Sequence, residues 1–237
     1  MKKKNYVVFN AAMTAVLFLF ILCASIWAVL AFRPLYYWII RLMKIPERTG
    51  YSFDVCKTNY DILIRYNQFF GPSTLRFTDD FVMSPNGAYH FMEVKRIFSA
   101  AQITALAAGA LLIPGFIFAK KKDTWWFLKA TIIFTLAIVL FVGGALVIDG
   151  NAAFIAMHKI LFTNDYWIFD PSKDSIIWVL PEEFFLACGG CIILLMVVLL
   201  VVCGVLYRKQ TAKKAAGGRK TGGKTAGKRT KKSGKKS

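Results

Sequence analysis

Long apolar stretches without a single charged side chain dominate the pattern of this chain. There are four, with 28, 23, 19 and 24 residues, at positions 5–32, 97–119, 130–148 and 184–207. A helix needs about 20 residues to cross the roughly 30 Å hydrocarbon core of a bilayer, where it can satisfy its own backbone hydrogen bonds. The pattern therefore predicts four transmembrane helices.

Interfacial residues refine the ends of these helices. Trp125 and Trp126 suit the aromatic belt at a membrane surface, with Lys129 reaching back toward the headgroups, so the third helix is predicted to begin before its charge-free stretch. Pro114 lies inside the second helix, where it either bends the helix or marks its end. The first stretch exceeds the roughly 7 to 15 apolar residues of a secretory signal, which favours a retained anchor. The four predicted spans are about 6–32, 98–119, 125–148 and 184–207.

The distribution of Lys and Arg predicts the orientation. Basic residues cluster at 2–4, at 120–122 and in the C-terminal tail. The positive-inside rule places these three clusters, and with them both termini, in the cytoplasm. Segments 33–96 and 149–183 then lie outside. The predicted fold is an all-α integral membrane domain over 1–207, in which four transmembrane helices carry a small extracellular cap made from the two outer loops.

Composition agrees with a membrane protein and locates the positive charge. With 57% hydrophobic and 19% charged residues, the chain is too apolar for an ordinary soluble domain. Thirteen of the 31 Lys and Arg lie in the tail, and without them the formal charge falls from +18 to +5. We therefore expect no nucleic-acid partner. The tail, 208–237, is of low complexity and is predicted to be disordered and cytoplasmic, serving topology or touching anionic headgroups.

Other motifs add little chemistry. Cys188 and Cys191 form C-G-G-C at the start of the fourth span, where helix packing is favoured over redox work. The sequence has no G-x-S-x-G, H-E-x-x-H or phosphate-loop motif, and no Cys/His set with metal spacing. We expect neither a metal nor a cofactor.

The chain has only two histidines, and both fall in predicted outer segments. His90 follows the turn-forming stretch 84–88, in a helix that continues into the second span, and Glu93 stands one turn further on. His158 lies in a helical pattern that leads into the aromatic-rich stretch 163–171. Either histidine alone is more often structural than catalytic. Two of them on one side of a membrane point to acid–base chemistry.

A wider set of residues accompanies the two histidines in both predicted outer segments. It consists of Asn59, Tyr60, Tyr66, Ser84, Gly87, His90, Phe91, Val94, Lys95, His158, Leu161, Phe162, Asp165, Trp167, Phe169, Asp170, Pro171, Leu180, Pro181, Phe184 and Phe185. In these residues the sequence resembles the bacterial lipoprotein intramolecular transacylases. The resemblance covers about 1–207 and leaves out the tail.

The resemblance implies an activity and a place for it. It implies catalytic histidines at the junction of cap and membrane, here His90 and His158. The family moves an acyl chain from the sn-2 glyceryl oxygen of a lipoprotein to the α-amine of the lipoprotein's own N-terminal cysteine. Diacylglyceryl lipoproteins and membrane lipid would be the partners, in the bacterial cytoplasmic membrane. Glu93 departs from the family pattern, in which Asp is expected at this position.

Imidazole suits this reaction. An α-amine has a pKa of about 8 and must lose a proton before it attacks, whereas imidazole titrates at about 6.5. Our hypothesis is that His158 takes the proton of the amine. His90 would stabilise the oxyanion or protonate the leaving alkoxide, with Glu93 or Lys95 tuning it, and the reverse order stays open.

The remaining candidates bind substrate. Tyr60, Tyr66, Trp167 and Phe169 are expected to shape the pocket, although interfacial anchoring or cap packing explains each equally well. Asp165 either contacts the substrate or caps a turn.

Two other classes of function compete with the enzyme. One is a non-catalytic receptor or assembly factor that binds a partner through its cap. The other, a transporter, is weaker because the predicted spans contain no acidic residue. The sequence does not indicate the oligomeric state.

Overall fold

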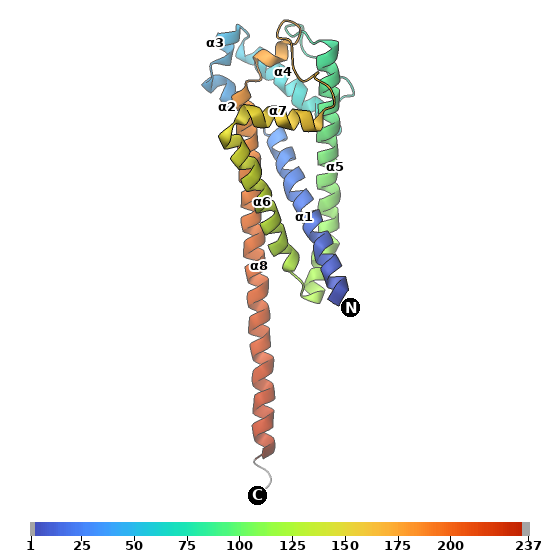
Figure 1. Ribbon diagram of the computed structural model, residues 1–237, viewed down its shortest axis with the longest axis vertical. Helices are drawn as coiled ribbons and strands as arrows, with labels where there is room; N and C mark the ends of the chain where they lie inside the picture. The colour runs from blue at the N-terminus through green and yellow to red at the C-terminus, as the bar shows by residue number, and fades with distance from the viewer. Residues whose placement is uncertain (1–2, 234–237) are drawn as a thin grey trace.

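The chain folds into helices joined by turns and loops (Figure 1). A computed structural model describes the backbone of residues 3–233 and the side chains of residues 6–214. Within the described backbone there is no strand. The elements are α1 (Lys3–Ala31), α2 (Pro34–Leu42), α3 (Ile45–Thr49), α4 (Phe53–Tyr66), α5 (Pro85–Lys122), α6 (Trp126–Ile148), α7 (Gly150–Leu161), η1 (Ser175–Trp178) and α8 (Glu182–Ser233).

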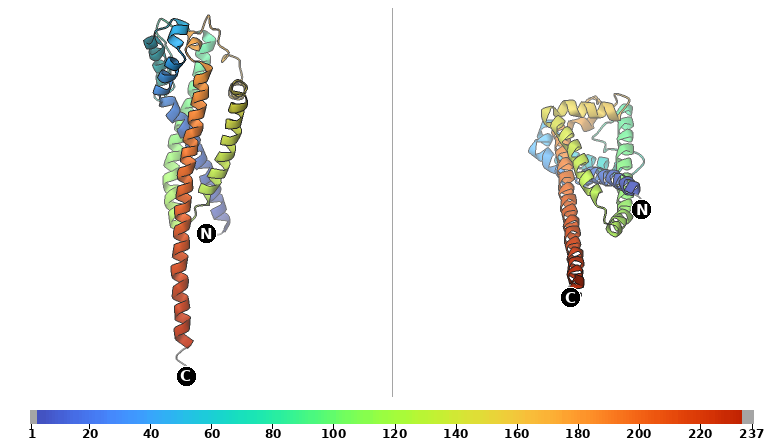
Figure 2. Two further views of the ribbon diagram at one scale, coloured as in Figure 1. Left: turned by 90° about the vertical axis from the view of Figure 1, so that its left-hand side faces the viewer. Right: turned by 60° about the horizontal axis from the view of Figure 1, so that its bottom comes forward.

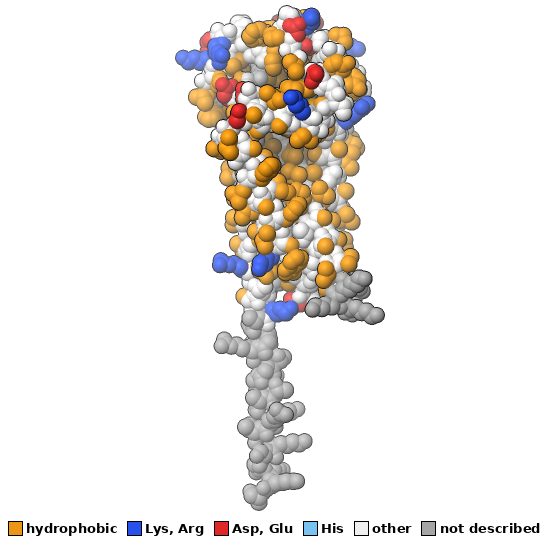
Figure 3. Space-filling model, viewed as in Figure 1, with side chains coloured by type: hydrophobic (Ala, Val, Ile, Leu, Met, Phe, Trp, Pro, Cys, Tyr) orange, Lys and Arg blue, Asp and Glu red, His pale blue; other side chains and the backbone are white. Residues whose placement is uncertain are grey.

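Four of these helices, α1, α5, α6 and α8, are long and apolar enough to cross a membrane. They run side by side, with α1 packed mainly on α5 and α6 packed mainly on α8 (Figures 1 and 2). Apolar side chains cover this part of the molecule, while charged side chains gather at its two ends (Figure 3). The predicted all-helical membrane fold is confirmed.

Helix α5 passes through Pro114 without a break and ends only at Lys122. The next residue, Gly115, explains how α5 packs on α1. A Cβ atom at Gly115 would lie 2.3 Å from the Sδ atom of Met13. The close approach of the two helices therefore depends on this glycine, and Pro114 does not terminate the helix.

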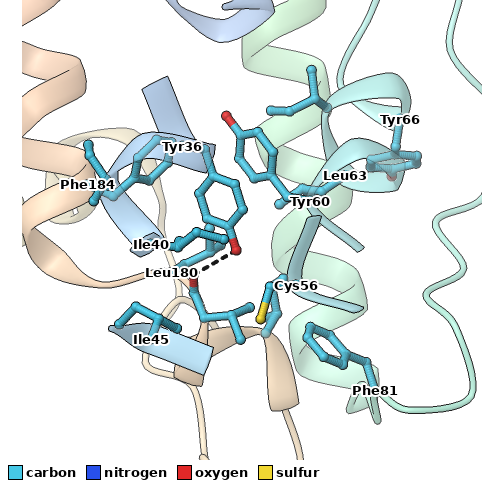
Figure 4. Packing of buried hydrophobic residues seen from close by; sticks show 14 of the residues in the cluster. Tyr36, Ile40, Ile45, Cys56, Tyr60, Leu63, Tyr66, Phe81, Leu180 and Phe184 are labelled. Atoms are coloured by element: carbon cyan, nitrogen blue, oxygen red, sulfur yellow. Dashed lines mark hydrogen bonds between the residues drawn. The ribbon is translucent and has the colours of Figure 1, made fainter. Parts of the chain in front are cut away.

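The cap is built from α2, α3, α4 and η1 around its own aromatic core. Tyr36 is fully buried and stacks on Tyr60, with ring centroids 3.8 Å apart and planes inclined by 13° (Figure 4). The Tyr36 hydroxyl donates a hydrogen bond of 3.0 Å to the carbonyl of Val179, just after η1. Phe184, in the first turn of α8, packs edge-on against both tyrosines. The cap core thus joins segments 33–96 and 149–183 to the start of the last membrane helix.

At the C-terminal end the structure differs from the predicted disorder. Helix α8 continues past the predicted end of the span, 207, as far as Ser233. A tail attached to an existing helix needs no new nucleus, and its Lys and Ala residues are good helix formers. Lys214 forms an ion pair of 3.0 Å with Asp123, at the turn between α5 and α6. Positions 234–237, also predicted to be disordered, lie outside the described residues.

Replacement of Tyr36 by Phe tests the cap core. Tyr36→Phe keeps the ring stack but leaves the buried carbonyl of Val179 without its donor, so the free energy of unfolding should fall by about 1 to 3 kcal/mol. Thermal unfolding in detergent measures the change. Tyr89→Phe is the control, because the exposed Tyr89 hydroxyl makes no hydrogen bond among the described residues. Equal melting temperatures for Tyr36→Phe and wild type would contradict this account.

Candidate active site

The two histidines lie together although 68 residues separate them in sequence. His90 stands in the second turn of α5, and His158 stands near the end of α7. Their ring centroids are 5.9 Å apart and the ring planes are inclined by 33°. Both side chains are buried, with exposed fractions of 6% and 8%. The fold thus brings two imidazoles from distant segments of the chain into one place.

The hydrogen bond of His158 fixes its tautomer. Its Nδ1 atom lies 2.8 Å from the carbonyl oxygen of Phe154, one turn earlier in α7. A carbonyl can only accept, so Nδ1 carries the hydrogen and Nε2 keeps a lone pair. Burial lowers the pKa of His158 and outweighs the opposing effect of this hydrogen bond. At neutral pH the residue is therefore a neutral base that offers Nε2.

His90 is also held in surroundings that disfavour a charge. Its Nδ1 atom is buried and has no hydrogen-bond partner among the described residues. The ring meets Phe162 at 4.7 Å and Phe169 at 5.5 Å, measured between centroids. Burial among aromatic rings, together with the nearby imidazole of His158, favours the neutral form. A buried polar atom without a partner costs free energy in a folded protein.

Aromatic rings enclose the pair. Around His158 stand Phe154 at 4.1 Å, Trp167 at 4.8 Å and Phe162 at 5.6 Å between centroids. Trp167 and Phe169, predicted to shape the pocket, do lie beside the histidines. The sequence analysis did not single out Phe154 and Phe162 as site residues. Their positions four residues before and after His158 place them on one face of a helix, which is the signal that would have found them.

A buried carboxylate holds the start of α5, one turn before His90. Ser84 caps the helix, since its Oγ atom accepts a hydrogen bond of 2.9 Å from the amide of Gly87. Asp174, with an exposed fraction of 2%, accepts from the Ser84 amide at 2.8 Å and from the Ser84 hydroxyl at 2.9 Å. A Cβ atom at Gly87 would come within 2.2 Å of the Asp174 carboxylate. This glycine therefore permits the contact that positions the helix.

The predicted tuning residues of His90 have other partners. The Glu93 carboxylate accepts hydrogen bonds of 3.2 and 3.1 Å from the side-chain amide of Asn164. The Lys95 ammonium donates to the carbonyl of Gly71 at 3.2 Å and to that of Pro72. Both residues thus fasten loops to α5, and neither forms a hydrogen bond with His90.

Three further candidates are not brought to the histidine pair. Tyr60 packs in the cap core, and Tyr66 is buried with the Lys95 ammonium 4.5 Å from its ring centroid. Asp165 is exposed, and its backbone carbonyl accepts a hydrogen bond from the Ile168 amide in a turn. Of the predicted pocket residues, only Trp167 and Phe169 contact the imidazoles. In the described part of the chain, no group of three or more His, Cys, Asp or Glu residues is arranged to hold a metal ion.

Substitution of Asp174 tests how α5 is held. Asp174→Ala removes both acceptors of Ser84, and the free energy of unfolding should fall by about 1 to 3 kcal/mol because buried donors lose their partners. Thermal unfolding in detergent measures this loss. Asp174→Asn is the matched variant, since its amide can still accept from the Ser84 backbone, and it should lose clearly less. Equal losses for the two variants would argue against the hydrogen bonds.

Comparison with known proteins gives one consistent result. The family described as lipoprotein intramolecular transacylase Lit matches residues 11–185. The solved structure of the membrane-integral lipoprotein intramolecular transacylase Lit from Bacillus cereus is 32% identical and superimposes with a TM-score of 0.87, covering 91% of this chain and 100% of that chain. Its variant with a histidine replaced by alanine is 32% identical, with a TM-score of 0.80, and covers 90% of this chain and 96% of that chain. Its variant with a histidine replaced by arginine is 33% identical, with a TM-score of 0.78, and covers 90% of this chain and 95% of that chain. No match was found among curated proteins. The chain therefore belongs to the lipoprotein intramolecular transacylases, which are acyltransferases of the membrane.

Proposed function

We propose that this protein moves the sn-2 acyl chain of a diacylglyceryl-modified lipoprotein to the α-amine of that lipoprotein's N-terminal cysteine. The product is a lyso lipoprotein. The observation that carries the proposal is the buried pair of imidazoles, 5.9 Å apart, with the lone pair of His158 on Nε2. Family membership supports the reaction class, and the pair supports a mechanism by acid–base catalysis.

The reaction needs no protein nucleophile, because the substrate supplies the amine. The amine nitrogen forms a bond to the sn-2 carbonyl carbon, and the bond from that carbon to the glyceryl oxygen breaks. The proton lost by the nitrogen goes to Nε2 of His158, and a proton returns to the glyceryl oxygen. Atoms and charges balance without a co-reactant. Neutral His158 is suited to the first transfer and its protonated form to the second.

His90 is assigned to the oxygen side of the reaction. As a neutral imidazole it has one N–H group that can donate to the oxyanion or to the departing glyceryl oxygen. Because the ring centroids of His90 and His158 are 5.9 Å apart, both imidazoles can reach the same small reacting group. A donor placed before the reaction begins stabilises the transition state without further reorganisation.

Positioning is the main difficulty of this reaction. The ring closed by the attack contains the amine nitrogen, Cα, Cβ, sulfur, two glyceryl carbons, the ester oxygen and the carbonyl carbon, which makes an eight-membered ring. Such rings close reluctantly, and holding the reacting atoms in place can contribute several kcal/mol. Phe154, Phe162 and Trp167 surround the imidazoles and supply a rigid apolar wall for that purpose.

The site is proposed to lie just outside the hydrocarbon core, on the extracellular side. With 38 residues, α5 is about 57 Å long, so it extends well beyond a core of roughly 30 Å. The basic residues at its other end, Lys120 to Lys122, mark the cytoplasmic side. The opposite end, with His90, then reaches the level where the ester groups of lipids lie. Both chain termini are placed in the cytoplasm.

Mass spectrometry of an abundant lipoprotein tests the activity. Cells with this protein should contain the N-terminal lipopeptide as N-acyl, S-monoacylglyceryl cysteine, and cells without it should not. His90→Ala and His158→Ala should each abolish that product or reduce it by about 100-fold or more. The same diacyl lipopeptide with a free amine in both cells would reject the proposal and favour a non-catalytic membrane protein that binds a partner.

The pH dependence tests the role of His158. Burial lowers the pKa of His158, so its neutral form persists below the ordinary value of about 6.5. The substrate amine, with a pKa of about 8, causes its own decline in kcat as the pH falls below 8. Because the neutral form of His158 is the base, protonation of His158 should cause a second decline with its midpoint below 6.5. A second decline with its midpoint above 6.5 would contradict the assignment of His158 as base.

A further inference from the structure

The segment between α7 and η1, residues 162–174, brings three aromatic rings to the histidines without regular secondary structure of its own. Phe162 and Phe169 contact His90, and Trp167 contacts His158. A connection of this length is usually either mobile or part of a functional site. Its position over the imidazoles must therefore come from specific contacts with the neighbouring helix.

Two polar contacts attach this segment to α5, one on each side of His90. The first joins Asp174, at the end of the segment, to Ser84 at the helix cap. The second joins Asn164, near the beginning, to Glu93, three residues beyond His90. The aromatic residues of the segment lie between these two attachment points.

The second contact is specific in its chemistry. The Asn164 side-chain amide donates to both carboxylate oxygens of Glu93, and its Oδ1 atom accepts from the Tyr166 backbone amide at 3.0 Å. Tyr166 in turn packs edge-on against Tyr89, one turn before Glu93, with centroids 5.4 Å apart. The ion pairs of the described side chains do not include Glu93. The charged carboxylate of Glu93 is thus paired with the side-chain amide of Asn164, through a charge-assisted hydrogen bond.

We propose that Glu93 and Asn164 are positioning residues for the acyl transfer: their hydrogen bond holds residues 162–170 on α5, so that Trp167 and Phe169 stay packed on the two imidazoles. The inference rests on the proposed function. Glu93 acts through the loop in this account, and its charge serves the bond to Asn164. A displacement of about 1 Å at such a site can cost about 100-fold in rate.

Exchanging the carboxylate and the amide between positions 93 and 164 separates the positioning role from a direct effect of charge on His90. Asn164→Asp keeps the acceptor for the Tyr166 amide but sets two carboxylates against each other, so kcat should fall by about 100-fold with KM little changed. Glu93→Gln keeps an acceptor for Asn164 and should lose much less. In the double variant Glu93→Gln with Asn164→Asp, the introduced amide donates to the introduced carboxylate. The double variant should recover the kcat of Glu93→Gln.

A second measurement follows the loop directly. Hydrogen exchange of the backbone amides in residues 162–170 should become faster in Asn164→Asp and return toward the wild-type rate in the double variant. Asn151→Asp, the same substitution at an exposed position of α7, is the matched control and should change neither kcat nor exchange in this segment.

Two results would overturn the proposal. One is wild-type kcat in Asn164→Asp. The other is a double variant whose kcat stays as low, and whose hydrogen exchange in residues 162–170 stays as fast, as in Asn164→Asp. That outcome would assign the loss of kcat to the new charge at position 164. A wild-type protein that makes no N-acyl lipopeptide would remove the proposed function itself, and the positioning role with it; the wild-type reaction therefore distinguishes the two failures.

Discussion

The site depends on α5 being one uninterrupted helix from its turn with α6 to the cap. In lipid a backbone must satisfy its own hydrogen bonds, and a helix that does so continues easily into the water-exposed region. Pro114 does not interrupt α5, and Gly115 lets it lie directly against α1. His90 is therefore carried on a rigid element whose height and rotation are set by the packing of the membrane helices.

The second imidazole reaches this helix by a different route. Helix α7 follows α6 directly, with Asp149 ending the first and capping the second, so the chain changes direction over a single residue. His158 is the ninth residue of α7 and meets His90 there, and the carbonyl of Phe154 fixes the tautomer of His158. Burial favours the neutral form of both imidazoles, and the rings that bury them are apolar.

The polar contacts around the site attach loops to α5. Asp174 holds the first turn of α5, Asn164 holds the loop beside Glu93, and Lys95 holds the turn at Gly71. Each joins α5 to a segment without regular structure, where aromatic packing alone would allow several arrangements. Asp174 is buried and the side chains of Asn164 and Lys95 are half-buried, so the loss of a partner costs free energy, and such contacts select one arrangement of the loop over the others.

The sequence by itself determined the membrane helices and the two histidines, because apolar runs of membrane length admit few structures and only two imidazoles exist in the chain. It also indicated Trp167 and Phe169 as neighbours of the site. The partner of Glu93 was decided by tertiary structure alone: spacing along a helix put the carboxylate near His90, whereas the loop supplied Asn164, 71 residues away. The same holds for Tyr60, which lies in the cap core. Local spacing limits what one helix can present, but only the packing of distant segments decides which side chains meet.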